Sequence, residues 1–253
     1  MENIVLQLNG LSKRYEDKVV VDHINLKVKK GEAIGLLGPN GAGKSTIIKM
    51  LVGNIKPSSG SMTLFGCDKE KEISKARRRI GFVPQDLALY SDLKVWENIE
   101  LFAGLYGLKG ASLKQGIHEV LQMVDLEREK DMLVKNLSEG MKRRLNMACA
   151  LTHLPELLIF DEPTVAIDPQ SRRFILEKIK EIHQKGCTIL YTSHYMEEVE
   201  YLCERIAILN HGKMIALGTK QELVDMVSNE NDDHLTLEEV FIRLTGKEFH
   251  LEE

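Results

Sequence analysis

The first thirty residues alternate between apolar and polar positions with the two-residue period of β-strands. Residues 3–9 follow this pattern, and residues 18–28 form a second run rich in valine and isoleucine. Successive side chains of a strand point to opposite faces, so such runs predict half-buried strands. We therefore expect an antiparallel opening from Asn3 to about Lys30.

Beyond residue 30 the pattern changes to short apolar runs separated by helical stretches. The run 32–37 is typical of a strand buried on both faces of a sheet, 157–161 predicts a buried strand that ends in an acid, and 187–193 predicts another strand. Residues 205–209 and 213–217 flank the turn sequence Asn210-His211-Gly212 and predict a hairpin. The expected helices span residues 45–52, 95–106 (stopped by Gly107), 112–125, 139–153 and 169–185, with a short amphipathic tail helix carrying Leu237, Val240, Phe241 and Leu244.

Strands that alternate with helices favour a mostly parallel sheet covered by helices. We predict an α/β fold in which an antiparallel N-terminal part precedes this sheet, and a helical insertion at about residues 86–155 interrupts it. Residues 227–234 are polar and acidic and predict a loop.

Composition places the chain among ordinary globular proteins. Of its 253 residues, 43% are hydrophobic and 28% are charged, which is enough apolar material for a core. No apolar run approaches the roughly 18 residues of a membrane-spanning helix, and the N-terminus lacks a basic-then-apolar signal pattern. We expect a soluble chain in the cytoplasm.

Charge and cysteine content narrow the possible ligands. The 34 basic and 38 acidic residues give a net charge of −4, which argues against a nucleic-acid partner. Two basic clusters, Arg77–Arg79 and Lys142–Arg144, are predicted to be solvated surfaces. The cysteines form no CxxC pair, so we expect buried thiols and no cysteine metal site; they are Cys67, Cys149, Cys187 and Cys203.

The strongest chemical signal is a phosphate-binding loop, GxxxxGK[ST], between an expected buried strand and a helix. Its glycines let backbone N–H groups point at phosphate oxygens, and the helix aims its positive end at the same charge. Lys44 would reach the β and γ phosphates, and the Ser45 hydroxyl would hold Mg²⁺. The predicted nucleotide-binding residues are Gly38, Pro39, Asn40, Gly41, Ala42, Gly43, Lys44, Ser45 and Thr46.

A second signal is a pair of acids that ends the apolar run Leu157–Phe160. Ligands of open α/β sheets bind at the carboxyl ends of the strands. We predict that Asp161 binds Mg²⁺, directly or through water, and that Glu162 is the general base that polarises the attacking water.

The sequence Leu137-Ser138-Glu139-Gly140-Met141 resembles the LSGGQ signature of ABC-type ATPases, and the resemblance covers nearly the whole chain. It implies one ATPase domain over residues 1–226, with the helical subdomain at 86–155, followed by a polar loop and a short helix over 227–253. It also implies ATP and Mg²⁺ as cofactors.

The resemblance further assigns roles to residues that are weak signals alone. Tyr15 matches an aromatic residue that stacks on adenine, and His194 matches a switch histidine that contacts the γ-phosphate. Gln85 matches a glutamine that senses the γ-phosphate, belongs to the metal site and couples to a partner. Ser138 and Gly140 match residues that complete the nucleotide site of an opposite subunit in a head-to-tail dimer. Ile167-Asp168 match the dimer-contact loop of the family, and Asp168 is counted among the expected nucleotide-binding residues.

Two residues depart from the family pattern. Glu139 replaces a glycine of the signature, where a carboxylate beside a phosphate would be repelled. We expect Glu139 to point away, at a helix N-terminus that favours a negative charge. Ala166 replaces a usual glycine of the dimer-contact loop, which is expected to affect its backbone.

The stretch 93–107, the sequence 140–145 and the tail 237–246 resemble bacterial drug- and antibiotic-exporter ATPases. That resemblance implies a peripheral subunit on the cytoplasmic side of the membrane, paired with itself or a paralogue and with separate membrane-spanning permease chains. The alternatives are a soluble ABC-type ATPase of DNA repair or translation, and a kinase or GTPase with the same phosphate loop.

Overall fold

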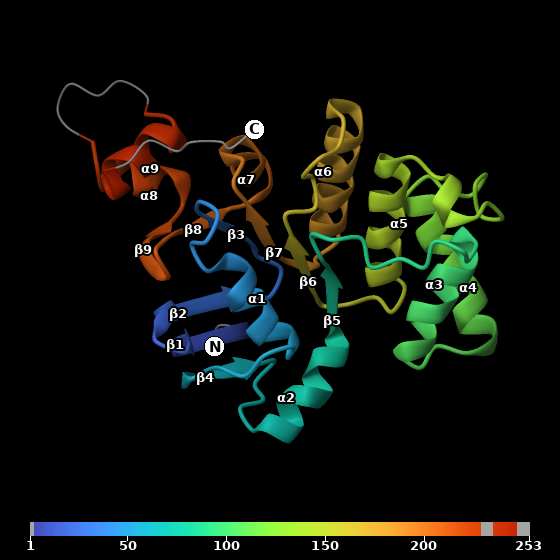
Figure 1. Ribbon diagram of the computed structural model, residues 1–253, viewed down its shortest axis with the longest axis horizontal. Coiled ribbons are helices and arrows are strands. Elements are labelled where there is room, and N and C mark those ends of the chain that lie inside the picture. Colours follow the sequence, from blue (N-terminus) through green and yellow to red (C-terminus); the bar gives the residue numbers. More distant parts are fainter. Residues whose placement is uncertain (1–2, 229–234, 247–253) are drawn as a thin grey trace. The chain divides into compact units, whose positions relative to one another are not determined.

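The computed structural model describes residues 3–228 and 235–246. The chain divides into two compact units (Figure 1). Unit 1 combines the residues up to Arg77 with those from Thr188 onward, and unit 2 is Arg78–Cys187. Each unit is described in turn.

Unit 1 opens with a three-stranded antiparallel sheet in the order β2-β1-β4. The first two strands confirm the alternating pattern, although β1 is longer than the run that predicted it. The third strand was not predicted, because its first half, Ser59–Ser61, has no apolar residue and only Met62 and Leu64 of the strand are buried. The strands are β1 (Ile4–Tyr15), β2 (Lys18–Lys29) and β4 (Ser59–Leu64).

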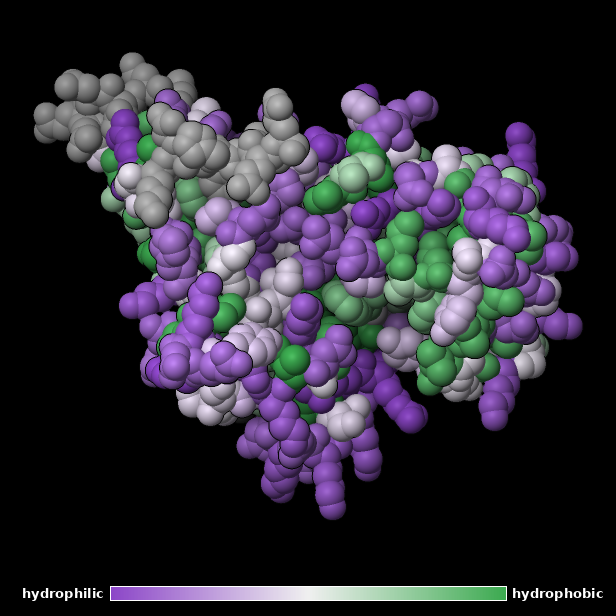
Figure 2. Space-filling model, viewed as in Figure 1, coloured by the Kyte–Doolittle hydropathy of each residue, from purple (hydrophilic) through white to green (hydrophobic). Residues whose placement is uncertain are grey.

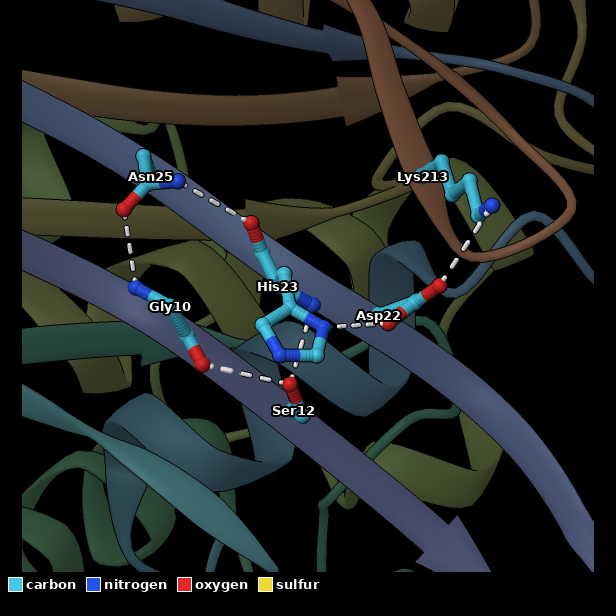
Figure 3. A network of polar contacts seen from close by, with 6 residues as sticks. All are labelled: Gly10, Ser12, Asp22, His23, Asn25 and Lys213. Carbon is cyan, nitrogen blue, oxygen red and sulfur yellow. Dashed lines mark hydrogen bonds and ion pairs between the residues drawn. The ribbon is translucent and has the colours of Figure 1, made fainter.

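A polar network crosses β1 and β2 where their register shifts between Leu8 and Leu11 (Figure 3). The amide of Gly10 donates to Asn25 Oδ1 at 2.8 Å, and Ser12 Oγ accepts from the amide of His23 at 2.9 Å. Gly10 and His23 both have a positive φ, so the strands bend here. The side chains therefore satisfy backbone groups that the irregular pairing leaves without strand partners.

The second sheet of unit 1 is the mostly parallel one. Strand β3 pairs in parallel with β7 and with β8, and β8 turns back into β9 as the predicted hairpin. All residues of β3 and β7 are buried; the continuous apolar sequence of β3 predicts this, whereas β7 also buries Thr188, Thr192 and Ser193. These strands are β3 (Ala33–Leu37), β7 (Thr188–Ser193), β8 (Arg205–Asn210) and β9 (Lys213–Gly218).

Helices of unit 1 pack beside these sheets. Gly35 of β3 lets α7 approach closely, because a Cβ there would lie 2.5 Å from Val199 Cγ1. The tail helix, α9, is present as predicted; it buries Leu237, Val240 and Phe241, whereas Leu244 is half-buried. The helices are α1 (Lys44–Val52), α2 (Glu70–Ala76), α7 (Met196–Leu202), α8 (Lys220–Asp225) and α9 (Leu237–Thr245).

Unit 2 holds one parallel strand pair, β5 (Ile80–Val83) and β6 (Leu157–Asp161), and the helices of the middle of the chain. Helix α3 packs against both α4 and α5, as Figure 1 shows. Gly107, with a φ of +89°, follows α3 as the expected stop. The helices are α3 (Val95–Leu105), α4 (Gly110–Met123), α5 (Glu139–Leu151) and α6 (Pro169–Gln184), with a short 3₁₀ turn at Val134–Asn136. Another short 3₁₀ turn, Arg77–Arg79, contains the last residue of the first segment of unit 1 and the first residues of unit 2.

The α/β fold with a mostly parallel sheet and an antiparallel N-terminal sheet is confirmed. Of the predicted loop, residues 229–234 lie outside the described residues. All four cysteines are free thiols. Cys149 is buried, whereas Cys67, Cys187 and Cys203 are half-buried, so the expectation of buried thiols is met fully by Cys149 alone. Within residues 3–228 and 235–246, no helix is long and apolar enough to cross a membrane.

Candidate nucleotide site

The phosphate loop connects β3 to α1 through left-handed glycines. Gly41 and Gly43 have φ values of +78° and +103°, and α1 begins directly afterwards at Lys44. A Cβ on Gly43 would lie 2.9 Å from the Val20 carbonyl oxygen, so both the conformation and the space require glycine. The loop therefore joins the start of a helix in the way an anion-binding site requires.

Lys44 is buried beneath this loop. Its Nζ donates to the carbonyl oxygens of Gly38 at 2.6 Å and Pro39 at 3.3 Å. Gly38 is itself confined, because a Cβ there would lie 2.4 Å from the Leu209 carbonyl oxygen. The ammonium group is thus held at the loop, where its charge would act on a phosphate.

Sequence reasoning missed Gly212, which supports the phosphate loop from outside. The Gly212 amide donates to the Ala42 carbonyl at 3.1 Å, and its own carbonyl accepts from the Asp22 amide at 2.8 Å. Gly212 has a φ of +79°, and a Cβ there would lie 2.5 Å from the Val20 oxygen. The only sequence signal was a turn, which says nothing of the partner.

Tyr15 ends β1 and remains largely exposed, with 44% of its surface accessible. Lys13 Nζ lies 5.1 Å from the centre of its ring. An exposed ring can offer a face to a planar base, as adenine stacking requires.

The turn after β7 is held by a buried carboxylate. Glu198 accepts hydrogen bonds from Tyr191 Oη at 2.8 Å and Ser193 Oγ at 2.9 Å. Ser193 Oγ in turn accepts from the Tyr195 amide at 2.9 Å. His194 lies inside this turn, half-buried, with its ring 4.2 Å from that of Tyr195. The backbone on either side of the predicted switch histidine is therefore fixed.

In unit 2 the two predicted acids stand at the end of β6. Asp161 is its last residue, and Glu162 follows with a φ of +48°. Both are buried, with exposed fractions of 6% and 5%. Carboxylate oxygens suit Mg²⁺, which needs few protein ligands because it keeps waters and phosphate oxygens. The described residues contain no cluster of three or more His, Cys, Asp or Glu, and a magnesium site of this kind needs none.

The signature begins helix α5. Ser138 is its N-cap and accepts from the Met141 amide at 3.2 Å. Glu139 is the first helical residue, and its carboxylate accepts from Lys142 Nζ at 2.7 Å one turn further along. The carboxylate of Glu139 is thus paired with a cation on its own helix.

Gly140 brings the signature against the start of α6. A Cβ on Gly140 would lie 2.1 Å from Ser171 Oγ and 3.6 Å from Asp168 Oδ2. Asp168 caps α6 by accepting from the Ser171 amide at 2.9 Å, and hydrogen bonds from the Ser171 side chain and backbone lower the pKa of Asp168. Ala166 adopts the left-handed conformation, φ +60°, that glycine would favour, so the loop keeps that geometry with strain.

Gln85 is exposed just after β5, and α5 binds its backbone. Arg143 Nη1 donates to the Gln85 carbonyl oxygen and Nη2 to the Val165 carbonyl oxygen, the latter at 3.3 Å. Asn146 Nδ2 donates to the Pro84 carbonyl oxygen at 3.3 Å. Unit 2 thus brings together Gln85, the signature and the loop before α6, whereas sequence reasoning had left Arg143 among solvated cations.

A buried strand, a glycine-rich loop and a helix that starts at lysine define a P-loop nucleotide-binding protein. The family model of ABC transporters matches residues 21–165. The chain belongs to the ABC transporter family, as an ATP-binding, ATP-hydrolysing subunit.

Two relatives and two solved structures show how far the similarity extends. The linearmycin resistance ATP-binding protein LnrL of Bacillus subtilis is 49% identical over 92% of this chain and 75% of its own length. The Nod factor export ATP-binding protein I of Cupriavidus metallidurans is 43% identical over 87% of this chain and 73% of its own. An ATP-binding subunit of an ABC transporter superposes with a TM-score of 0.85, at 31% identity, over 95% of this chain and 99% of that chain. The dimeric ATP-binding cassette MJ0796, bound to ADP and phosphate, reaches 0.76 at 28% identity over 85% and 98%.

Proposed function

We propose that this chain is the ATPase subunit of an exporter and that ATP-dependent closure of a dimer drives transport. The observation that carries the proposal is the phosphate loop with Lys44 held at it. Two relatives named for antibiotic resistance and for export support the direction of transport.

In this proposal each predicted residue has a defined role in nucleotide binding. Residues 38–46 cradle the phosphates, and Tyr15 stacks on adenine. Ser45, Asp161 and Gln85 would supply oxygen ligands for Mg²⁺, which would stabilise charge on the phosphates. Their hydroxyl, carboxylate and amide oxygens are the hard donors that this ion prefers.

Catalysis is assigned to three side chains. Glu162 acts as the general base toward water, and its position at the end of a buried strand supports that role. His194 and Gln85 contact the γ-phosphate and signal its presence. The turn around His194 is fixed by Glu198, which favours a defined orientation for the histidine.

A second copy or a paralogue completes each site. The chain has one phosphate loop and one signature, and Ser138, Gly140 and Asp168 would meet the nucleotide of the opposite chain. The similar cassette MJ0796 is a dimer, which supports this arrangement.

Separate membrane-spanning chains are the proposed partners, at the cytoplasmic face of the membrane. Unit 2 offers an apolar surface for them: Tyr90, Leu101 and Leu105 are exposed on and before α3. Figure 2 shows hydrophobic surface over the part of unit 2 that contains α3 and α4. We further propose that residues 1–226 form the ATPase domain, with residues 86–155 as its helical subdomain, and that 227–253 form an appended tail.

Two variants separate binding from hydrolysis. Lys44→Ala should lose ATP binding, because the charge at the phosphates is removed, whereas Glu162→Gln should bind ATP and hydrolyse it poorly. With ATP and Mg²⁺, light scattering should show that Glu162→Gln forms dimers and that Lys44→Ala does not. A Glu162→Gln variant that stays monomeric at saturating ATP would refute closure of a dimer.

The partner is identified by affinity purification from membranes of the native host in mild detergent, followed by mass spectrometry. A multi-span protein that co-purifies with the wild type supports the exporter proposal. Ribosomal or DNA-bound partners alone would refute it and favour the soluble alternative.

A further inference from the structure

One face of the signature helix binds backbone carbonyl groups of two loops. Arg143 donates to the Gln85 oxygen with one guanidinium nitrogen and to the Val165 oxygen with another. Asn146, one turn along α5 and buried, adds a bond to the Pro84 oxygen at 3.3 Å. Three polar contacts therefore connect the first turns of α5 to the loops that carry the predicted sensor glutamine and the predicted dimer contact.

Arg143 is only partly solvated, contrary to the prediction for the cluster Lys142–Arg144. Burial lowers the pKa of Arg143, against an opposing effect of the Glu139 and Asp86 carboxylates. Its Nε is buried without a hydrogen-bond partner among the described residues. A guanidinium held at this desolvation cost indicates that its two carbonyl bonds fix its position.

The neighbouring cations have different partners. Lys142 pairs with Glu139, and Arg144 donates to the Val124 and Asp125 carbonyls at 3.2 and 3.1 Å while lying over the Phe174 ring. Arg144 therefore holds the end of α4, not the two loops. Of these three cations, Arg143 is the one whose described contacts reach both the Gln85 loop and the Val165 loop.

We infer that Arg143 is a positioning residue of the ATPase site: its two-pronged guanidinium binds the Gln85 loop and the Val165 loop to the signature helix, so that the three move together. The inference rests on the proposed function, which assigns Gln85 and Asp168 their roles. A planar guanidinium can span two carbonyl oxygens in fixed directions, whereas a lysine ammonium is a point charge.

The test compares Arg143→Gln and Arg143→Lys in the full-length chain. By hydrogen–deuterium exchange without nucleotide, both variants should exchange faster than the wild type in peptides covering residues 82–88 and 162–168. In ATP hydrolysis with Mg²⁺, kcat should fall about tenfold in both, the value of one charge-assisted hydrogen bond, while KM changes less than about twofold. Lys142→Gln is the matched control, since it removes one charge from the same helix, and it should change neither measurement.

The outcomes separate this inference from the proposed function. Faster exchange in only one loop or in neither, full activity of Arg143→Lys, or an equal effect of Lys142→Gln would each overturn the inference. So would a parallel loss of kcat, ATP affinity and melting temperature, because that indicates a general structural role. If the wild type hydrolyses no more ATP than Lys44→Ala, the proposed function fails, and the exchange experiment still decides whether Arg143 joins the loops.

Discussion

Gly212 has no side chain, and this lets its backbone lie close enough to bind the phosphate loop, which is far away in the sequence. A methyl group there would collide with the Val20 oxygen, 2.5 Å away, and displace the turn whose amide binds Ala42. We expect Gly212→Ala to weaken ATP binding about tenfold or more, which corresponds to a loss of about 1.4 kcal/mol in binding free energy when the phosphate loop is displaced. Isothermal titration with ATP measures the loss.

Gly66 provides the control for that substitution. Its φ of +80° matches the +79° of Gly212, but a Cβ at Gly66 would meet nothing within 4 Å. Gly66→Ala therefore carries the same conformational strain without the collision, and its ATP affinity should equal that of the wild type. Equal losses in the two variants would contradict the proposed support of the loop.

Glu139 tests whether an acid in the signature harms the site. Its carboxylate is paired with Lys142 at 2.7 Å and lies in the first turn of α5, where a negative charge is favoured. We expect Glu139→Gly to change the ATP turnover rate less than about twofold, since exposed pairs contribute little. A large increase in turnover would mean that the acid does repel nucleotide.

The local structure around predicted site residues that lie in one contiguous segment could be predicted from the sequence. The phosphate loop and the acids after β6 carry their structural context beside them, as a strand, a loop or a helix. Gly212 and Arg143 could not be predicted, because their partners are far away in the sequence. Nothing in a turn or a run of cations specifies which carbonyl group it will meet.

At the scale of elements, a stacked pair of rings joins the end of α3 to the end of α5. Tyr106 and His153 lie 3.5 Å apart at 6°, and His153 Nε2 is 3.0 Å from the Ile80 carbonyl oxygen. Its Nδ1 is buried without a hydrogen-bond partner among the described residues, and burial lowers the pKa of His153. The folded protein therefore favours the neutral His153 ring, whereas in the unfolded chain the pKa of His153 is near the ordinary histidine value of about 6.5.

This difference makes the free energy of unfolding depend on pH. The contribution of His153 to the free energy of unfolding is fully present above about pH 6.5. It is lost as the pH falls below this value, because the unfolded state then binds more protons than the folded state. Urea unfolding should show a smaller loss of stability between about pH 7.5 and pH 5.5 for His153→Phe, which keeps the stack without titrating. An unchanged slope in His153→Phe would exclude this residue.

Helix α9 should stabilise unit 1 through its buried face. Phe241 is 2% exposed, and replacing a buried phenylalanine with alanine costs about 3 to 5 kcal/mol in free energy of unfolding. We expect Phe241→Ala to lower the melting temperature measured by calorimetry. Glu238→Ala, on the exposed side of the same helix, should have little effect; a similar small effect of Phe241→Ala would show that α9 is not docked in solution.

Element type could be predicted where periodicity was long or burial complete. The longer predicted helices and the apolar strands are present, because their patterns reflect which face is buried. The elements missed were β4, α2, β5, α7 and α8, which have four to seven residues each. Two turns of helix are too few to show a period, so tertiary packing decides their conformation.

At the scale of the whole molecule, one phosphate loop and one signature per chain predict complementation between two inactive variants. In the proposed dimer, Lys44→Ala would remove the phosphate contact, and Ser138→Arg, at an exposed position of the fold, would block the nucleotide of the opposite chain. In a head-to-tail dimer of the two, one site receives both defects and the other receives none. Each variant alone should be inactive, whereas an equimolar mixture should recover about one quarter of wild-type turnover, because half the dimers are mixed and each has one intact site.

A mixture as inactive as its components would mean either that the signature serves its own chain or that the two sites hydrolyse only together. A mixture of wild type with the double variant Lys44→Ala, Ser138→Arg distinguishes these two explanations. If the signature serves its own chain, the wild-type subunit of each mixed dimer keeps an intact site and adds turnover. If the signature serves the opposite chain, each site of a mixed dimer has one defect, and the mixed dimers should add no turnover.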